Sequence, residues 1–496
     1  MKIIAVLSIA FFAFFQSLAQ STFNEKDSIE IRGKVIGYNP KQEDHFITFA
    51  TYNLSGKSKQ QAIQISDDGS FWIKCYQPFI GDVQVSYKDA YLNLYAEPKK
   101  PIILTINDAK VNRETGQDAA FSVKGELANI NNDLLKFATA FTQHQFAVKT
   151  DMGDKSQTDS AFAAKIKLRL KEELEFFDLF IKTNQINNQT FINWQRNHLQ
   201  YTAAKETLFF PFAGKFNKEI TQEKLLRLLE GIPLNNELAF HNSSYYSFLN
   251  MLNGDQQIII NINPLYESLK KENKGNSIGI LLDEIDKYAN GLTKQFLYSL
   301  TYSGSGGGYA SDPAQFSNRF DQIITNPFLK RQLQVKQVPN QNTFKAYSIV
   351  DRLKALKVKE PLKQRLINIF NKYQGTSLYI DFWGDWCGPC MSELPSYPKL
   401  IAAMDGKPIK FLFLSTFTTE ESMLAIKEKF KIKGDFINLN KDEVAIVNNI
   451  FEFHSYPSHF LVNDKGNVIE NMAKIAVDGA DKKAQQIDNL LKKSAQ

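Results

Sequence analysis

Cys387 and Cys390 are the residues whose spacing in this chain most directly indicates chemistry. They lie in the segment Trp386-Cys387-Gly388-Pro389-Cys390, between a predicted strand and a predicted helix. A Cys-x-x-Cys pair at a helix start can close a small disulfide ring with little backbone movement, and its first sulfur faces backbone N–H groups that lack helical partners. Because these donors stabilise a thiolate, we expect the pKa of Cys387 to fall below about 8.5. The pattern predicts a dithiol that is oxidised and reduced reversibly, and Pro389, which has no N–H, suits a first helical turn.

Two acidic residues are candidates for moving the proton of Cys390, which must be lost before this cysteine can resolve a mixed disulfide. Asp381 lies in an apolar strand, where burial would raise the pKa of its carboxyl group towards neutrality. Glu393 follows Cys390 by three residues and lies one helical turn further along. The alternatives are a partly solvated strand end for Asp381 and a carboxylate on the helix surface for Glu393.

Other roles for the cysteines fit the spacing less well. Zinc would need two further ligands at suitable spacing, and the chain has no second Cys-x-x-Cys. Covalent haem attachment would need His directly after the second cysteine, where this chain has Met391. A structural disulfide stays open, although so short a loop constrains the unfolded chain little. Cys75, the third cysteine, is expected to be a buried small hydrophobic residue, and we expect neither a metal nor a cofactor.

The elements that must position these residues alternate between strand and helix from residue 341 onward. Thr418-x-x-Glu421 has the form of a capping box that opens a helix. The alternation, which ends in a hairpin and a helix, predicts a layered α/β domain. The expected strands are Leu378–Trp383, Ile409–Ser415, Phe436–Leu439, Ser458–Asn463 and Val468–Glu470, and the expected helices are Cys390–Met404, Thr418–Lys431, Asp442–Asn449 and Gly479–Lys493.

Residues 341–496 resemble the thioredoxin superfamily. The stretch from Asp381 to Cys390 is similar to thioredoxin's active-site segment, and Pro395 matches its helix-kinking proline. The pattern Trp-Cys-x-Pro-Cys-x-x-Glu-x-Pro resembles more closely the secreted TlpA/ResA-like thiol–disulfide oxidoreductases. The resemblance implies a thioredoxin-like fold, a redox-active Cys387–Cys390 disulfide, Asp381 as a buried acid and Glu393 as an active-site acid. It also implies a role like that of cytochrome-maturation thiol reductases.

The resemblance further implies a cis-proline that faces the disulfide, and Tyr456-Pro457 stands where that proline is expected. X-Pro bonds are the only ones that adopt cis at low cost. The backbone of Tyr456 would then pair with an extended substrate, as an added strand does. Tyr456 departs from the Thr or Ile often found there, and an ordinary trans turn proline is the alternative. The implied substrate contacts are Trp386, Gly388, Pro389, Tyr456 and Pro457.

Two histidines, His454 and His459, flank the proline loop. We interpret both as surface residues. The alternative is that they tune the electrostatics of the thiols, because histidine changes charge near neutral pH.

The chain before residue 341 shows two further patterns. Residues 20–125 carry short strands that alternate with period two, as in Ile29-Glu30-Ile31, and predict a β-sandwich in which Phe71, Ile73 and Cys75 share one face. Residues 126–340 change to helical spacing, as in Ala161–Thr183 and Thr221–Leu229. We interpret their abundant aromatic residues as the core of a helix bundle, with a surface that grips unfolded clients as the alternative. The stretch Ser303–Gly308 lacks the Lys-Ser/Thr ending of a phosphate loop and is expected to be a surface loop.

The first residues predict secretion. Lys2 precedes an apolar run from Ile3 to Phe15, and small residues stand at Ser17 and Ala19. This is the pattern of a signal peptide over residues 1–19, cleaved after Ala19, with an uncleaved anchor as the alternative. The run is shorter than the roughly 20 apolar residues of a membrane span. We therefore expect a periplasmic or otherwise extracytoplasmic protein.

The composition of the chain limits which classes of partner we expect. The chain is 496 residues long and 43% hydrophobic, which indicates a multidomain globular protein. Its 59 basic and 53 acidic residues are too balanced to indicate a nucleic-acid partner. We expect a thiol–disulfide oxidoreductase that reduces protein disulfides and takes its electrons from a membrane partner. The alternative is a cell-envelope binding or chaperone-like protein with an accessory thioredoxin-like domain.

Overall fold

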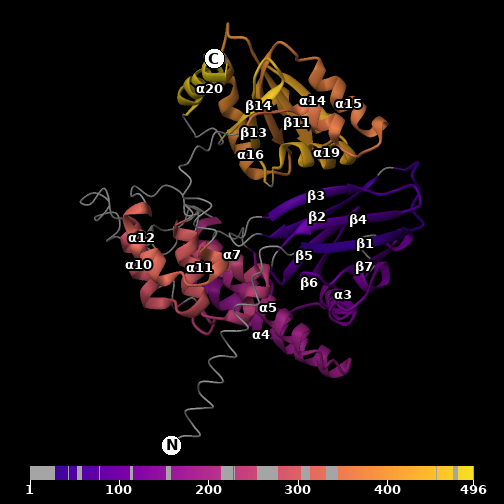
Figure 1. Ribbon diagram of the computed structural model, residues 1–496, viewed down its shortest axis with the longest axis vertical. Helices are drawn as coiled ribbons and strands as arrows, with labels where there is room; N and C mark the ends of the chain where they lie inside the picture. Colours follow the sequence, from indigo (N-terminus) through magenta and orange to yellow (C-terminus); the bar gives the residue numbers. More distant parts are fainter. Residues whose placement is uncertain are drawn as a thin grey trace, which may run out of the picture. The chain divides into compact units, whose positions relative to one another are not determined.

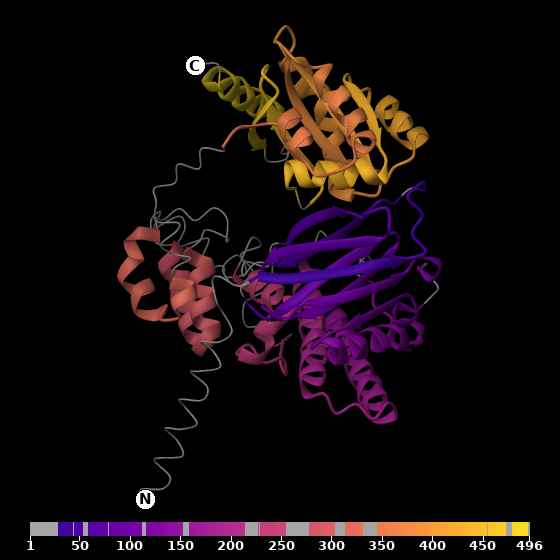
Figure 2. The same ribbon diagram turned by 45° about the vertical axis from the view of Figure 1, so that its right-hand side comes forward.

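The computed structural model describes residues 28–494 except 43, 53–57, 78, 112–115, 152–157, 214–226, 228, 254–276, 303–312, 331–344, 454 and 473–478. The chain divides into two compact units, each described here by itself (Figures 1 and 2). Unit 1 holds most of the chain up to Pro339, and unit 2 comprises Asn340–Gln496 with the segments Asn39–Phe49 and Lys59–Asp67. The domain limits at residues 125 and 340 stay predictions. Four features of the sequence analysis lie outside the described residues: the predicted signal peptide, Ser303–Gly308, His454 and most of Thr221–Leu229.

The strands of the first hundred described residues form two four-stranded sheets. Along β4 the side chains of Phe71, Ile73 and Cys75 are buried, while Trp72 between them is exposed, so the period-two pattern is confirmed. The β-sandwich itself stays a prediction. One sheet has the order β4-β1-β7-β8 and the other β3-β2-β5-β6. Their strands are β1 (Ser28–Ile36), β2 (Phe46–Tyr52), β3 (Ser58–Gln64), β4 (Ser70–Tyr76), β5 (Gly81–Tyr87), β6 (Ala90–Ala96), β7 (Ile102–Asn107) and β8 (Phe121–Lys124).

The described part of unit 1 that follows β8 is helical. The helix expected at Ala161–Thr183 is α4, which Thr158 caps by accepting a hydrogen bond from the backbone of Ala161. Phe177 is fully buried and packs edge-on against Phe137, as expected for a bundle core. The helices of unit 1 are α2 (Gln117–Ala120), α3 (Ala128–Gln143), α4 (Asp159–Thr183), α5 (Gln189–Ala213), α7 (Ser243–Asn253), α10 (Ser277–Tyr288), α11 (Gly291–Tyr302) and α12 (Ser317–Ile323).

Unit 2 contains a six-stranded sheet of order β12-β11-β10-β13-β14-β9. Strand β10 pairs in parallel with β11 and antiparallel with β13, so the sheet is mixed. The strands are β9 (Tyr347–Ser348), β10 (Ser377–Trp383), β11 (Ile409–Thr416), β12 (Asp435–Leu439), β13 (Ser458–Val462) and β14 (Asn467–Met472). The helices are α14 (Ile349–Ala355), α15 (Glu360–Asn371), α16 (Gly388–Glu393), α17 (Tyr397–Ala403), α18 (Glu420–Phe430), α19 (Lys441–Phe451) and α20 (Ala480–Ser494).

Helices cover both faces of this sheet, so its central strand β10 is buried along its whole length. Leu378, Ile380 and Phe382 pack in one core with residues of α15 and α19. Tyr379 and Trp383, on the opposite face, pack in a second core with both cysteines and residues of α17, α18 and α20. Because side chains alternate along a strand, Asp381 shares the face of Tyr379 and Trp383.

Two expected elements differ from the structure. The single helix Cys390–Met404 is wrong: α16 ends at Glu393, a 3-10 turn follows, and α17 begins at Tyr397. Pro395 lies in that turn, and a proline inside a helix removes a hydrogen bond and clashes with the preceding turn. The cap expected at Thr418 is also wrong, because the side chain that caps α18 is that of Thr419.

Among the described residues, no helix is both long and apolar enough to cross a bilayer.

Candidate active site

The two cysteines lie where β10 has ended and α16 begins. Cys387 is the N-cap of α16, and its Sγ accepts a hydrogen bond from the backbone N–H of Cys390 at 3.2 Å. A disulfide joins the two sulfurs. Both residues are almost wholly buried, with 4% and 2% of their surface exposed. A sulfur at a helix N-terminus faces unpaired N–H groups, which favour its thiolate when the disulfide is open.

An aromatic rim lies at the cysteine pair. Trp386 and Phe417 are more than half exposed, and Tyr456 packs edge-on against Trp386 with ring centroids 5.1 Å apart. The indole N–H of Trp386 donates to the carbonyl of Thr416 at 3.0 Å, which fixes the exposed ring. We call Trp386, Phe417 and Tyr456 the aromatic rim. Exposed aromatic groups held in one orientation are typical of surfaces that contact a partner.

The proline loop and the Gly388 position complete this surface. The Tyr456–Pro457 peptide bond is cis. Tyr456 is partly buried and packs against the core that contains both cysteines. A Cβ added at Gly388 would meet no atom within 4 Å, so the space beside the cysteine pair is open to an incoming group.

The loop before the cysteines is tied to the following strand–helix connection. Asp385 accepts a hydrogen bond from Ser422 Oγ at 2.6 Å and a second from Thr418 Oγ1 at 3.1 Å. The hydroxyl of Thr418 also lies 3.1 Å from the backbone nitrogen of Asp385, from which it accepts a hydrogen bond. These side-chain bonds hold the turn between β10 and α16. Sequence reasoning missed this role of Asp385, because its partners lie more than thirty residues away.

The two expected acids are buried on the cysteine face of the sheet. Asp381 is 2% and Glu393 4% exposed, so neither is a solvated carboxylate. The hydroxyl of Tyr397 donates to Asp381 Oδ2 at 2.7 Å. Burial and the charge of Asp381 raise the pKa of Tyr397 well above its usual value, so the hydroxyl stays protonated and remains a donor.

His459 lies between the two acids, and its interpretation as a surface residue is wrong. It is 1% exposed, and its Nε2 is 3.3 Å from Asp381 Oδ1 and 3.5 Å from Glu393 Oε1. The register of β10 with β13 sets Asp381 directly opposite His459, so the pair follows from the sheet. The sequence signal was a polar residue in the apolar strand Ser458–Val462, on the same face as Leu461.

The charge on His459 depends on its two acidic neighbours, Asp381 and Glu393. Burial opposes a charge on the imidazole, but the charges of Asp381 and Glu393 outweigh it, so the pKa of His459 is raised. On α20, burial lowers the pKa of Lys483, although the charge of Glu393 opposes that shift. The cluster can therefore hold a proton shared between an imidazole and two carboxyl groups, within the core that contains both cysteines.

Comparisons with known proteins agree with this geometry over part of the chain. The chain is 31% identical over 109 residues to sporulation thiol-disulfide oxidoreductase A of Bacillus subtilis, which covers 21% of this chain and 61% of that protein. It is 25% identical over 96 residues to the thiol-disulfide oxidoreductase ResA of Geobacillus kaustophilus, covering 19% and 53%. The chain thus spans less than two thirds of the length of these relatives. No family model matches.

Solved structures give the same kind of match. The thioredoxin domain of a thiol-disulfide oxidoreductase from Bacteroides vulgatus is 24% identical, with a TM-score of 0.22 and coverage of 23% of this chain and 81% of that one. A thiol:disulfide interchange protein from a Bacteroides species is 23% identical, with a TM-score of 0.22 and coverage of 25% and 77%. Part of this chain is therefore similar in sequence to proteins named thiol–disulfide oxidoreductases.

Proposed function

We propose that this chain is an extracytoplasmic thiol–disulfide oxidoreductase that reduces protein disulfides through Cys387 and Cys390. The observation that carries the proposal is the disulfide at the N-terminus of α16, with a buried acid–imidazole cluster in the same core and an open surface beside it. The named activities of the relatives support the same chemistry.

The exchange begins with the reduced pair. The Cys387 thiolate attacks one sulfur of a substrate disulfide, forms a mixed disulfide and releases the other substrate sulfur as a thiolate, which takes up a proton. Cys390 then loses its proton and attacks the sulfur of Cys387. This step restores the Cys387–Cys390 disulfide and releases the second substrate thiol, so the substrate gains two electrons and two protons in all. A dithiol donor at the membrane returns the pair to its reduced form by the same two steps in reverse.

The acid–imidazole cluster takes up the proton that Cys390 loses. A sheltered thiol needs a base within the protein, since water has no direct access to it. Asp381 and Glu393 are the two acids on the cysteine face, and His459 joins them. The two carboxylates accept that proton as Cys390 attacks, with the imidazole between them balancing their charge, and return it when the pair is reduced.

The substrate docks on the surface formed by the aromatic rim and the cis-proline loop. The backbone of Tyr456 pairs with an extended substrate segment, as an added strand does. Trp386 and Tyr456 contact the side chains that flank the substrate disulfide, and the open space at Gly388 admits its sulfurs. Pro389 and Pro457 complete the contact surface.

A reductase is the direction that we propose, because the Gly-Pro pair between the cysteines resembles that of reducing thioredoxins. For this two-electron couple about 30 mV corresponds to 1.4 kcal/mol, so small changes around the disulfide set the direction. Thiol trapping in intact cells measures it. A mostly reduced Cys387/Cys390 pair is expected, and a mostly oxidised pair would mean that the protein is an oxidant.

Insulin reduction with dithiothreitol tests the activity in the full-length protein. We expect the wild type to accelerate insulin precipitation and Cys387→Ser to abolish the acceleration, because the attacking sulfur is gone. Cys75→Ser is the matched control, since Cys75 is a buried cysteine outside the site. Wild-type protein without acceleration would refute the proposal. If Cys387→Ser still complements a deletion strain, the biological role lies in binding rather than in exchange.

A further inference from the structure

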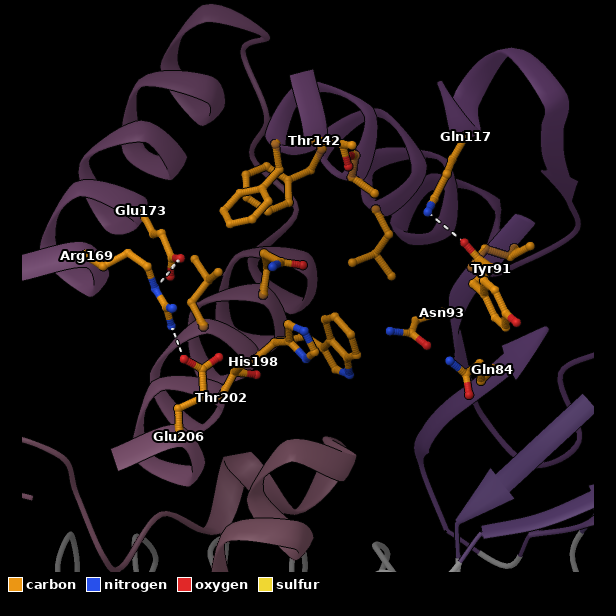
Figure 3. A pocket seen from close by; sticks show the side chains of 18 residues that line it. Gln84, Tyr91, Asn93, Gln117, Thr142, Arg169, Glu173, His198, Thr202 and Glu206 are labelled. Atoms are coloured by element: carbon orange, nitrogen blue, oxygen red, sulfur yellow. Dashed lines mark hydrogen bonds and ion pairs between the residues drawn. The ribbon is translucent and has the colours of Figure 1, made fainter. Parts of the chain in front are cut away.

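Unit 1 contains a pocket that the redox chemistry does not use. Its volume is about 460 Å³, within the range of roughly 300–1,000 Å³ that is typical of small-molecule sites. The hairpin β5–β6 forms one wall, and α3, α4 and α5 form the others. Figure 3 shows Arg169, Glu173 and Glu206 at one side of the space and Asn93 and Gln84 at the other.

Three side-chain amides line this pocket without a partner. The structure describes no hydrogen bond of the side-chain amides of Gln84 and Asn93, which are half-buried, or of Gln195. Gln84 and Asn93 lie directly opposite each other on β5 and β6, so they present their amides side by side. Gln195 comes from α5 and is 6% exposed. The half-buried amides of Gln84 and Asn93 face the open space of the pocket, where they can hydrogen-bond a ligand that displaces water.

The charged groups of the pocket are already paired and disfavour an anion. The guanidinium of Arg169 lies 3.0 Å from Glu173 and donates to Glu206 at 2.7 Å and to Thr150 at 2.6 Å, so three groups hold it in place. Two carboxyl groups for one guanidinium give this side of the pocket a negative balance. Burial raises the pKa of Glu173 to about 6, with Arg169 opposing, so the carboxyl ionises near neutral pH. A phosphate or carboxylate ligand would meet repulsion here.

A neutral imidazole and apolar rings complete the wall. Burial and the charge of Lys205 lower the pKa of His198 to about 4, so its ring is uncharged at neutral pH. His198 Nδ1 lies 3.0 Å from Ser244 Oγ, and the ring stacks on Trp194 with centroids 5.3 Å apart. Tyr91 also lines the pocket and is 60% exposed. The wall thus combines flat apolar surface with neutral groups that donate and accept hydrogen bonds.

We propose that this pocket binds a neutral carbohydrate of one or two rings. Each sugar hydroxyl both donates and accepts, as each Asn or Gln amide does, so the unpaired amides match several hydroxyls on one ring. The apolar C–H face of a sugar ring suits an aromatic surface such as that of Tyr91. An extended peptide offers only one backbone donor and one acceptor per residue, which fits so compact a set of amides less well.

Titration calorimetry on the full-length protein tests the proposal with a panel of neutral mono- and disaccharides. Glucuronate, glucosamine and a neutral tetrapeptide serve as anionic, cationic and peptide probes. We expect at least one neutral saccharide to bind with a Kd of about 1 mM or tighter. Asn93→Ala and Gln84→Ala should each weaken that binding about tenfold, because a ligand hydroxyl loses its partner.

Gln189→Ala is the matched control, because Gln189 is exposed on the same helix as Gln195 but outside the pocket. It should bind as the wild type does. Cys387→Ser should also bind normally, which separates this site from the exchange chemistry. Unchanged circular dichroism shows that each variant is folded. The proposal is overturned if no neutral saccharide binds, if only a charged or peptide probe binds, or if saccharide binding survives both amide substitutions.

Discussion

At the scale of single residues, His459 changes the charge balance around the two buried acids, Asp381 and Glu393. Two buried carboxylates close together repel each other, so one would normally stay protonated. An imidazole whose Nε2 lies 3.3 Å and 3.5 Å from the two carboxyl groups supplies the missing positive charge. We therefore regard Asp381, Glu393 and His459 as one cluster of coupled charges rather than as a single base with a relay.

Removing the imidazole should leave an uncompensated buried charge. His459→Gln is expected to lower the free energy of unfolding of unit 2 by about 3 kcal/mol, because breaking one partner of a buried pair is costly. It should also slow insulin reduction about tenfold or more and shift its pH profile. Urea unfolding measures the change in the free energy of unfolding, and the pH profile of insulin reduction measures the change in activity. His144→Gln, at an exposed histidine, should change neither, and an unaltered profile for His459→Gln would show that the imidazole only fills space.

The raised pKa of His459 makes the stability of the site depend on pH. Since its folded value lies above the usual 6.5, protonation of His459 stabilises the fold fully below pH 6.5, and this contribution disappears as the pH rises through the folded pKa. The urea midpoint of the wild type should therefore fall as the pH rises above about 6.5. His459→Gln should lack most of this fall. A wild-type midpoint that rises over this window would contradict the assignment.

At the scale of elements, side-chain caps set where the helices around the site begin. The sulfur of Cys387 caps α16, so the same atom that forms the disulfide also stabilises the start of the helix. Asn440 caps α19 through a capping box: its side chain accepts from the backbone of Glu443 at 2.9 Å, and the carboxylate of Glu443 accepts from the backbone of Asn440 at 3.0 Å. Helix α19 leads into the loop that carries Tyr456 and Pro457.

This cap supports a prediction about stability. Asn440→Ala should lower the free energy of unfolding of unit 2 by about 1 kcal/mol, because the N–H of Glu443 loses its partner. Asn440→Ser keeps an accepting oxygen and should recover most of that loss. Urea unfolding of both variants measures the difference. Equal losses in the two variants would mean that the asparagine acts through something other than its cap.

At the scale of the whole molecule, each unit has a hydrophobic core of its own. One large cluster, which includes Tyr245 and Phe296, lies wholly within unit 1. The cluster that holds both cysteines lies wholly within unit 2. Because these two cores share no residue, we expect the units to unfold as separate cooperative blocks. The proposed saccharide site and the proposed redox site lie in different units.

Scanning calorimetry should show this separation as at least two transitions. Dithiothreitol should lower only the transition of unit 2, since a reductase stabilises its disulfide form. A saccharide that binds the unit 1 pocket should raise only the other transition, by mass action. A single transition that responds to both additions would mean that the units unfold together. A rise with dithiothreitol would instead indicate an oxidant.

The sequence alone was sufficient for the features that depend on local spacing. Cys387 and Cys390 are one helical turn apart, so their disulfide needs only the local conformation, which their neighbours specify. The strand–helix alternation after residue 341 was readable because buried strands and amphipathic helices have different periods. Helix boundaries were less accurate, as the break at Pro395 and the cap at Thr419 show.

Only the tertiary structure decided which distant residues meet. His459 contacts Asp381 because the sheet pairs β10 with β13 in one register, and that register is set by the packing of both sheet faces rather than by the residues near His459. The unit 1 pocket arises in the same way, from amides on a hairpin and on α5 that no local pattern connects. The cysteine pair was thus determined by neighbours in sequence, whereas the place of His459 beside the two acids and the unit 1 pocket were determined by long-range packing.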